Sequence, residues 1–219
     1  MIKINQLSKS YFGRELFANV SFQMNAGERL GLVGRNGYAK TTLFRLVLGQ
    51  EEPDSGEITI PRSYRIGHLE QHLHFTQPTI LEEAAVGLPE EEVHSVYKVK
   101  AILFGLGFSQ ADLDRAPGEF SGGFQIRINL AKLLLSEPNL LLLDEPTNYL
   151  DITSVRWVTR FLCNFKGELI LISHDRGFMD PVTTHTAVIH PQKVRKFEGG
   201  TAHAYAQIVL EDEIHEKTR

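Results

Sequence analysis

Residues 28–48 read ERLGLVGRNGYAKTTLFRLVL, which joins a short apolar run to a longer periodic one through a glycine-bearing loop. The apolar run at residues 28–33 is typical of a buried central strand, because it is short and ends at a glycine. After the loop, apolar residues recur at three- and four-residue spacing, which predicts a helix at about residues 40–48. A strand, a loop and a helix in this order indicate a layered α/β domain with a largely parallel sheet.

The loop nearly matches the phosphate-binding pattern G-x-x-x-x-G-K-[ST], and it stands between a strand and a helix, as that pattern requires. Its glycines allow a tight turn whose N–H groups converge on phosphate oxygens, and the helix N-terminus adds a favourable dipole. We expect Lys40 to contact the β- and γ-phosphates of a nucleotide and the Thr41 hydroxyl to bind Mg²⁺. The predicted ATP-binding residues of this loop are Gly34, Arg35, Asn36, Gly37, Tyr38, Ala39, Lys40, Thr41 and Thr42.

One position departs from the pattern, because Ala39 stands where a glycine should precede the lysine. If φ at that position is positive, the added Cβ atom costs roughly 1 kcal/mol and also crowds a phosphate oxygen. We therefore predict that the loop forms with weakened nucleotide affinity.

The same patterns predict the other elements. Short apolar runs at residues 140–143 and 168–173 indicate buried strands, and helical spacing predicts helices at 123–135 and 153–164. Closely alternating apolar residues near the N-terminus indicate antiparallel strands around a turn at Gly13. The charged tail after Gly200 is predicted to be helical.

These elements predict one α/β domain of the P-loop NTPase type with a mostly parallel sheet core. Residues 1–71 and 121–200 would form the ATPase core lobe, which includes an N-terminal antiparallel β subdomain. Residues 72–120 would form an inserted α-helical subdomain, and residues 201–219 the start of a C-terminal linker helix. The composition agrees, since 219 residues of which 42% are hydrophobic can fill a single core.

Composition and charge exclude several classes of protein. The one cysteine, Cys163, cannot build a disulfide framework or a cysteine-based zinc site, and no apolar run approaches the ~18 to 20 residues that cross a bilayer. The N-terminus lacks the apolar core of a secretory signal, so we predict a cytoplasmic protein without membrane insertion. A net charge of −4 weakens a nucleic-acid role, although a local basic face stays open.

Two acidic residues, Asp144 and Glu145, follow the four leucines at 140–143. Ligands of open parallel sheets bind at the carboxyl ends of the strands, so we expect these carboxylates beside the phosphate loop. Asp144 is suited to hold Mg²⁺, and Glu145 is suited to orient an attacking water or to accept its proton. A solvated turn is the alternative interpretation of this pair.

A second anion site is predicted at Ser121, Gly122 and Gly123, where a helix begins, and a plain N-cap is the alternative. With the segments above, these residues resemble the nucleotide-binding domain of the ATP-binding cassette (ABC) superfamily, over essentially the whole chain. In that resemblance they are the signature motif, which departs from the usual Leu-Ser-Gly-Gly-Gln at Phe120 and Phe124.

The resemblance implies roles for further residues. Gln71 matches the Q-loop residue that senses Mg²⁺ and the attacking water, and Asp151 ends the D-loop at residues 146–151. His174 matches the switch histidine that contacts the γ-phosphate. Tyr11 fits the aromatic residue that stacks on adenine, and Phe12 is a weaker candidate. The implied catalytic residues are Glu145, His174 and Gln71, and the implied metal-binding residues are Thr41, Gln71 and Asp144.

The resemblance also implies a partner. In this family two cassettes sandwich two ATP molecules, and each nucleotide touches the phosphate loop of one cassette and the signature motif of the other. A chain with one copy of each motif is then a weak ATPase alone. Its partner is a second ABC cassette, either from the same full-length chain or from a second copy in a homodimer.

Three functional classes stay open. The signature segment, the D-loop Thr-Asn-Tyr-Leu-Asp and the switch sequence Ser-His-Asp-Arg resemble the N-terminal cassette of ABC-F proteins, which act on the ribosome without a membrane partner. The chain would then be an amino-terminal cassette cut shortly into its linker, and the ribosome or its RNA a partner of the full-length protein. The alternative is the peripheral ATPase subunit of a membrane transporter. The third class is a switch that binds ATP with negligible hydrolysis.

Overall fold

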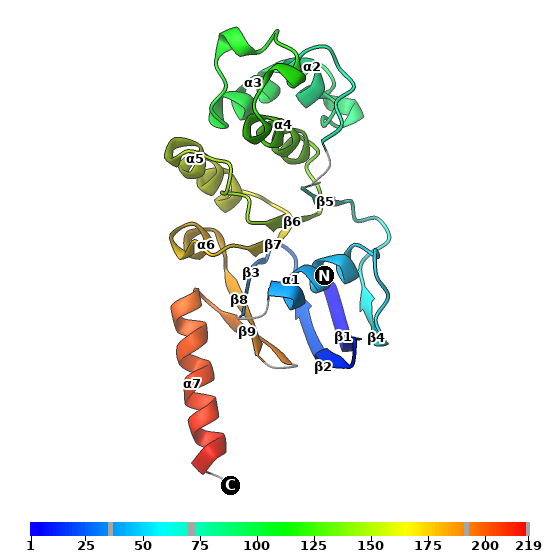
Figure 1. Cartoon of the computed structure of the whole chain (residues 1–219), viewed down its shortest axis with the longest axis vertical. Helices are drawn as coiled ribbons and strands as arrows, with labels where there is room; N and C mark the ends of the chain where they lie inside the picture. Colours follow the sequence, from blue (N-terminus) through cyan, green and yellow to red (C-terminus); the bar gives the residue numbers. More distant parts are fainter. Residues whose placement is uncertain (35–36, 70–72, 191–192, 218–219) are drawn as a thin grey trace. The chain divides into compact units, whose positions relative to one another are not determined.

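The computed structural model describes residues 1–34, 37–69, 73–190 and 193–217. They cluster into two compact units, of which the first combines Met1–Tyr64 with Glu168–Arg219 and the second is Arg65–Gly167. Their strands and helices confirm the predicted α/β class, with parallel strands in the core and a separate antiparallel sheet (Figure 1). Among the residues described, no helix is both long enough and apolar enough to cross a membrane.

The first unit contains an antiparallel sheet in the order β2-β1-β4, built from Ile2–Tyr11 (β1), Arg14–Met24 (β2) and Ser55–Thr59 (β4). Tyr11 pairs with Arg14, so Phe12 and Gly13 form the two-residue turn between β1 and β2. Both turn residues have positive φ angles, 49° and 77°, which a type I′ hairpin turn requires. The predicted turn at Gly13 is confirmed.

The apolar alternation of β1 is interrupted at Gln6. Ile2 and Ile4 are buried, but the next buried side chain is Leu7, and the register with β2 shifts between Ile4 and Leu7. Gln6 has a φ of 47°, so a bulge at this residue returns Leu7 to the buried face.

The first unit also contains four strands in the order β7-β3-β8-β9. Glu168–Ile172 (β7), Arg29–Gly34 (β3) and His185–His190 (β8) run parallel, whereas Lys193–Glu198 (β9) is antiparallel to β8. β3 has a paired strand on each side, and its side chains Leu30 and Leu32 are at most 1% exposed. The strands predicted at 28–33 and 168–173 are confirmed.

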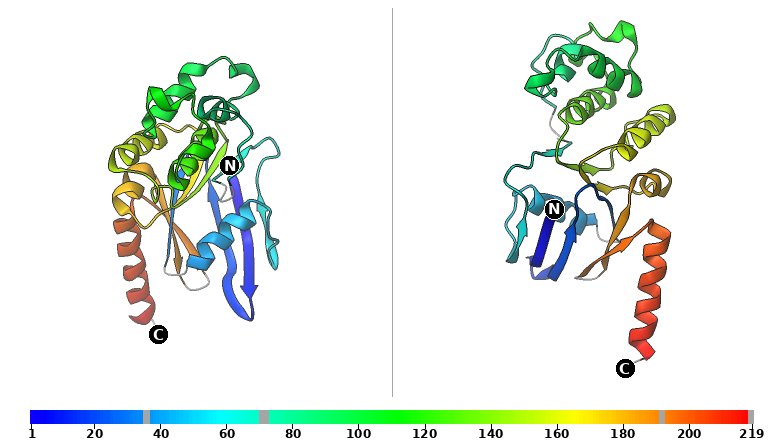
Figure 2. Two further views of the ribbon diagram at one scale, coloured as in Figure 1. Left: turned by 45° about the horizontal axis from the view of Figure 1, so that its top comes forward. Right: turned by 180° about the vertical axis from the view of Figure 1, so that it is seen from behind.

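Three helices belong to the first unit, namely Gly37–Val47 (α1), Arg176–Val182 (α6) and Thr201–Lys217 (α7). α1 confirms the helix predicted at about 40–48, and α7 confirms the helical tail. Asp180 of α6 caps α7. Its carboxylate accepts hydrogen bonds from the backbone N–H of Thr201 at 2.9 Å and from the hydroxyl of Thr201 at 3.1 Å. Helix α7 starts beside the end of β9 (Figure 2). Its residues Ala204 and Ile208 pack against Val188 of β8.

The described residues of the second unit form two parallel strands and four α-helices. The strands are Ile66–His68 (β5) and Leu140–Asp144 (β6), and the helices are Ile80–Ala85 (α2), Val96–Gly105 (α3), Gly122–Leu135 (α4) and Ile152–Cys163 (α5). The elements predicted at 123–135, 140–143 and 153–164 are therefore confirmed. The segment 72–120 falls inside this unit together with α4, β6 and α5, and its separation as an inserted subdomain stays a prediction.

Two contacts hold the helices of the second unit together. The fully buried carboxylate of Glu83 in α2 accepts the N–H groups of Thr76 and Gln77, each at 2.8 Å, and pairs with Lys132 of α4. Burial raises the pKa of Glu83, but the bond from Lys132 and the two backbone N–H groups outweigh it and hold this pKa below its usual value. Gly105 of α3 meets Trp157 of α5 so closely that an added Cβ atom would lie 2.0 Å from the indole ring.

Candidate functional site

The phosphate-loop strand is positioned by a close approach to β8. β3 ends at Gly34, which pairs with Ile189 of β8. A Cβ atom at Gly34 would lie 2.8 Å from the carbonyl oxygen of Ile189 and 2.9 Å from its Cβ. Only glycine therefore fits at the point where the chain leaves the sheet and enters the loop.

Lys40 lies in α1 just beyond the loop, and its side chain is turned inward. The residue is 6% exposed, and its ammonium group donates a hydrogen bond to the carbonyl oxygen of Gly34 at 2.9 Å. This bond joins the two ends of the loop and fixes the cation at its base. Thr41 is exposed and Thr42 is buried. Arg35 and Asn36 lie outside the described residues, and at Gly37 and Tyr38 only the start of α1 is described.

The strain predicted at Ala39 does not arise. Ala39 belongs to α1, and it is not among the non-glycine residues with positive φ. Its methyl group is buried, at 1% exposure. Because the backbone is helical at this position, alanine is favoured over glycine by up to about 1 kcal/mol. The condition for this strain, a positive φ at Ala39, is therefore not met, and the effect of Ala39 on nucleotide affinity stays a prediction.

Replacing Ala39 with glycine is accordingly expected to lower the free energy of unfolding by about 0.5 to 1 kcal/mol, because glycine loses more backbone freedom in a helix. Nucleotide affinity is not expected to rise, since the substitution relieves no strain. Urea unfolding measures the first quantity and titration calorimetry the second. A glycine variant that binds nucleotide more tightly than the parent chain would show that the methyl group obstructs the ligand.

His174 lies at the same sheet edge as the phosphate loop, within the first unit. β7 and β3 are adjacent and parallel, with Leu30 opposite Ile170 and Gly31 opposite Leu171, so their carboxyl ends coincide. His174 is exposed. It lies between the end of β7 and the N-cap of α6, next to that N-cap residue. That cap, Asp175, accepts the N–H of Phe178 at 3.2 Å and donates its own N–H to the Ser173 hydroxyl at 3.1 Å. The structure thus brings together two of the predicted site segments.

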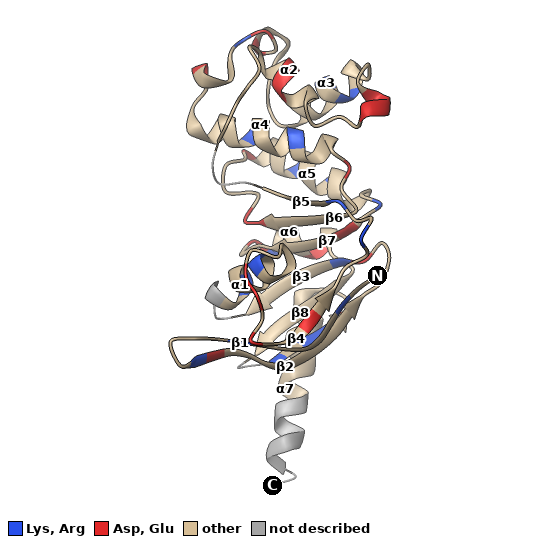
Figure 3. Cartoon of the chain, turned by 90° about the vertical axis from the view of Figure 1, so that its right-hand side faces the viewer, with Lys and Arg blue, Asp and Glu red and all other residues tan. Residues whose placement is uncertain are grey.

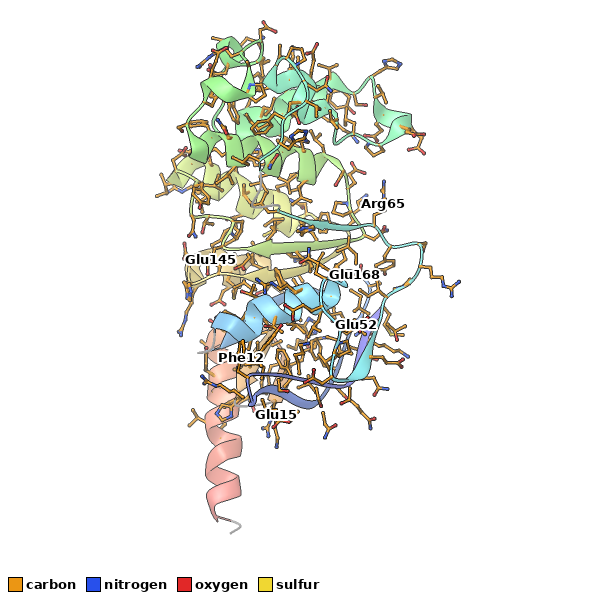
Figure 4. The ribbon with its side chains drawn as sticks, turned by 45° about the vertical axis from the view of Figure 1, so that its right-hand side comes forward. Phe12, Glu15, Glu52, Arg65, Glu145 and Glu168 are labelled. Atoms are coloured by element: carbon orange, nitrogen blue, oxygen red, sulfur yellow. The ribbon has the colours of Figure 1, made fainter. Side chains whose placement is uncertain are left out.

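The two aromatic candidates for adenine differ in their surroundings. Tyr11 is partly buried, its hydroxyl is enclosed, and the ammonium group of Lys9 lies 5.3 Å from the centre of its ring. Phe12 is fully exposed in the β1–β2 turn, with a φ of 49° (Figure 4). A left-handed conformation of a bulky residue is uncommon and costs about 1 to 2 kcal/mol. The stacking role of Tyr11, with Phe12 as the alternative, remains a prediction.

The second unit presents the two predicted carboxylates at the end of β6. β5 and β6 are parallel, with His68 opposite Leu142, so Asp144 and Glu145 follow the carboxyl end of the pair. Asp144 is exposed, whereas Glu145 is partly buried and has a φ of 47° (Figure 4). Strained backbone of this kind gathers at functional sites, which favours a functional role for Glu145 over a plain solvated turn. Gln71 lies outside the described residues.

The signature segment begins α4. Ser121 occupies the N-cap position with an exposed side chain that makes no capping bond, and a Cβ atom at Gly122 would meet open space. The two departures from the usual motif are explained by packing, because Phe120 and Phe124 lie edge-on to Phe108, at ring-centre distances of 5.5 and 5.3 Å. The aromatic side chains therefore support the segment from behind.

Asp151 of the D-loop caps α5. Its Oδ1 accepts the N–H of Ser154 at 2.9 Å, and its Oδ2 lies 2.9 Å from Nη1 of Arg127. The backbone bond from Ser154 and then the bond from Arg127 lower the pKa of Asp151 to about 2. The role of Arg127 cannot be predicted from the sequence, since these hydrogen-bond partners lie more than 20 positions away and no spacing marks them.

The oxygen donors predicted for Mg²⁺ are of the right chemical kind. Thr41 offers a hydroxyl and Asp144 a carboxylate, and Mg²⁺ is normally held by one or two such protein oxygens together with nucleotide phosphates and water. Among the described side chains, no three His, Cys, Asp or Glu residues form a cluster that could hold a metal ion alone.

Comparison with known proteins identifies the family. A family model described as "ABC transporter" matches residues 17–148, which include the phosphate loop and the two carboxylates after β6. The chain belongs to the ABC family. It is an ABC ATPase cassette, and the resemblance inferred from the motifs is confirmed.

The curated relatives of this cassette include ABC-F proteins. It is 38% identical to the energy-dependent translational throttle protein EttA of Escherichia coli, over 91% of the cassette and 37% of EttA. It is 31% identical to ABC transporter F family member 5 of Arabidopsis thaliana, over 95% of the cassette and 36% of that protein. The cassette thus spans less than two fifths of the length of these two relatives.

Solved structures share the fold of the cassette. The ATP-binding subunit of an ABC transporter superposes with a TM-score of 0.77 at 22% identity, and all of both chains is covered. A dimeric ATP-binding cassette in a post-hydrolysis state with ADP and Pi gives a TM-score of 0.71 at 20% identity, over 90% of this chain and 98% of that one. At such identities the likeness concerns the fold.

Proposed function

We propose that this cassette binds ATP with Mg²⁺ and hydrolyses it as one half of a two-cassette assembly, in a cytoplasmic ABC-F protein that acts in translation. The observation that supports ATP binding most directly is the phosphate loop itself. Gly34 leaves the sheet where only glycine fits, the inward-turned Lys40 stands at the base of the loop, and His174 follows the neighbouring strand.

Different residues of the chain would have different roles in ATP hydrolysis. The loop from Gly34 to Thr42 would bind the phosphates, and Mg²⁺, when bound to Thr41, Gln71 and Asp144, neutralises charge on the phosphate oxygens. Glu145 would orient a water whose oxygen forms the new bond to the γ-phosphorus, while the bond to the β–γ bridging oxygen breaks. Glu145 would accept the proton of that water, and His174 would hold the γ-phosphate.

The partner in this proposal is a second cassette. Ser121, Gly122 and Gly123 would contact the nucleotide of that partner, and Asp151 would lie at the same interface. The exposed Ser121 side chain and the open space at Gly122 agree with such a contact. A second cassette of the same full-length chain and a second copy of this cassette would give the same half-site chemistry.

A role in translation is supported by the relative EttA, which is named a translational throttle protein, and by the plant relative, which is named an F family member. Charge gives little support, since basic and acidic residues are interspersed along the described ribbon (Figure 3). Several lysines are paired, for example Lys98 with Glu137 at 3.3 Å and Lys196 with Glu28. A ribosome contact would therefore involve parts of the full-length protein besides this cassette. The ATPase subunit of a membrane transporter stays the alternative function.

Dimer-dependent hydrolysis is tested by the effect of protein concentration on the rate. Below the dissociation constant of the pair, a tenfold rise in concentration is expected to raise total hydrolysis by about 100-fold, because the fraction of paired cassettes also rises. Phosphate release measures the rate, and sedimentation with ATP measures pairing. A rate proportional to concentration while the cassette sediments as a monomer would contradict the proposal.

Co-sedimentation of the full-length protein with ribosomes then distinguishes the translation role from the transporter role.

A further inference from the structure

The side chain of Arg127 connects three segments of the second unit, namely α4, the D-loop and the end of α3. It lies in α4, one to two turns beyond the signature residues, and it is 6% exposed. Its Nε donates to the carbonyl oxygen of Tyr149 in the D-loop at 2.8 Å. Its Nη1 donates to the carbonyl oxygen of Leu106 after α3 at 2.8 Å and to Oδ2 of Asp151 at 2.9 Å.

The same guanidinium group touches the signature segment. Its central carbon lies 4.4 Å from the centre of the Phe124 ring, within the range of a cation–π contact. Phe124 follows Gly123 directly and packs edge-on against Phe108. One side chain thus contacts both the signature segment and the D-loop.

Arginine suits this position better than any other residue. A planar guanidinium can donate in several fixed directions while its face covers an aromatic ring, and it stays charged when buried. Asp151 supplies the opposite charge that a nearly buried cation needs, while its other oxygen caps α5 through Ser154. A lysine could reach one of these acceptors but could not hold a carbonyl group and a carboxylate in a fixed relation.

We propose that Arg127 is a positioning residue that fixes the D-loop in register with the signature segment, so that both meet the partner cassette as one preformed surface. This inference rests on the proposed two-cassette function. In this role Arg127 acts through Tyr149 and Asp151. A loose D-loop would lose conformational entropy when two cassettes associate. Because Arg127 holds the D-loop in place beforehand, this loss is smaller.

Arg127→Lys is the direct test, with Arg115→Lys as its matched control. Arg115 lies in the same unit and covers Phe120 at 4.3 Å, but its ion pairs, with Asp112 and Glu119, do not involve the D-loop. The protein concentration that gives half-maximal hydrolysis is expected to rise by about tenfold in Arg127→Lys, because a loosened D-loop must be ordered when two cassettes associate. It is expected to stay unchanged in Arg115→Lys. Binding of a fluorescent ATP analogue to the unpaired cassette should be unaltered in both.

Coupling to Asp151 separates positioning from a general loss of stability. Asp151→Asn keeps an oxygen for the cap but loses the ion pair, so it should shift the concentration dependence in the same direction. The double variant should shift it no further than Arg127→Lys alone, because both substitutions break one contact. Emission of Trp157, the single tryptophan, reports whether the second unit stays folded.

Three results would overturn the proposal. The first is that Arg127→Lys reaches half-maximal hydrolysis at the same protein concentration as the parent. The second is that the shifts of this concentration in the two single variants add up in the double variant. The third, which decides the matter if Arg127→Lys does not fold, is a parental concentration dependence in Asp151→Asn. Failure of the proposed function is distinguishable from all three, because the parent cassette would then show hydrolysis proportional to its own concentration before any variant is made.

Discussion

Replacing Lys40 with methionine is expected to weaken ATP binding by about 100-fold, because it removes a charged donor to the β- and γ-phosphates. The ammonium group is held at the base of the loop by its bond to Gly34, so little ordering is needed when phosphate binds. Methionine has a similar length and can fill the same buried space. Titration calorimetry with ATP and magnesium measures the affinity.

Lys3→Met is the matched control for this substitution. Lys3 is also in the first unit, but it is exposed on β1 and takes no part in the predicted site. Its loss removes the same charge from the whole chain without removing a phosphate ligand, so ATP affinity should be unchanged. Equal affinities of Lys40→Met and the parent would refute the phosphate-binding role of the loop, and with it the proposed function.

Glu145→Gln is expected to reduce ATP hydrolysis by about 100- to 1,000-fold while ATP binding is retained, which is the effect of losing a general base. Glutamine has the same size but cannot accept the proton of the attacking water. Because the ATP-bound pair is then not consumed, dimers should accumulate and be visible by sedimentation. Single-turnover phosphate release measures the chemical step itself.

Glu137→Gln controls for the unusual backbone of Glu145. Glu137 lies in the same unit and also has a positive φ, 44°, but it forms a partly exposed ion pair with Lys98. Its substitution changes the same functional group in the same backbone conformation and should leave hydrolysis intact. If Glu145→Gln hydrolysed ATP as fast as the parent at equal nucleotide occupancy, the cassette would be a binding switch and Glu145 would have no catalytic role.

The elements whose positions are predicted from the sequence have strong apolar patterns, although the apolar strand β8 is not among them. The strands at β3, β6 and β7 and the helices α1, α4 and α5 carry long apolar or periodic runs, and their predicted positions agree with the structure. β4 has no such signal, because its residues are exposed apart from Ile58, which is partly buried. A strand that contributes hydrogen bonds rather than apolar burial cannot be found from periodicity.

The predicted site residues came from motifs, and their surroundings could not be predicted. That Ala39 is helical, and so unstrained, depends on where α1 begins, which motif spacing leaves uncertain by a few residues. The network around Arg127 joins residues from α4, the D-loop and the end of α3, and it requires tertiary structure. Such contacts follow from folding, so they become visible only once the chain is placed in space.

The cap that Asp180 provides for α7 has a mechanical consequence. Asp180 lies in α6, the helix that starts right after His174, so the base of α7 is tied to the segment that follows this histidine. At about 1.5 Å per residue the 17-residue α7 is about 25 Å long, so a tilt of about 10° at its base swings its far end by about 4 Å. A small movement of α6 that tilts the base of α7 would therefore displace the far end of α7 by a larger distance.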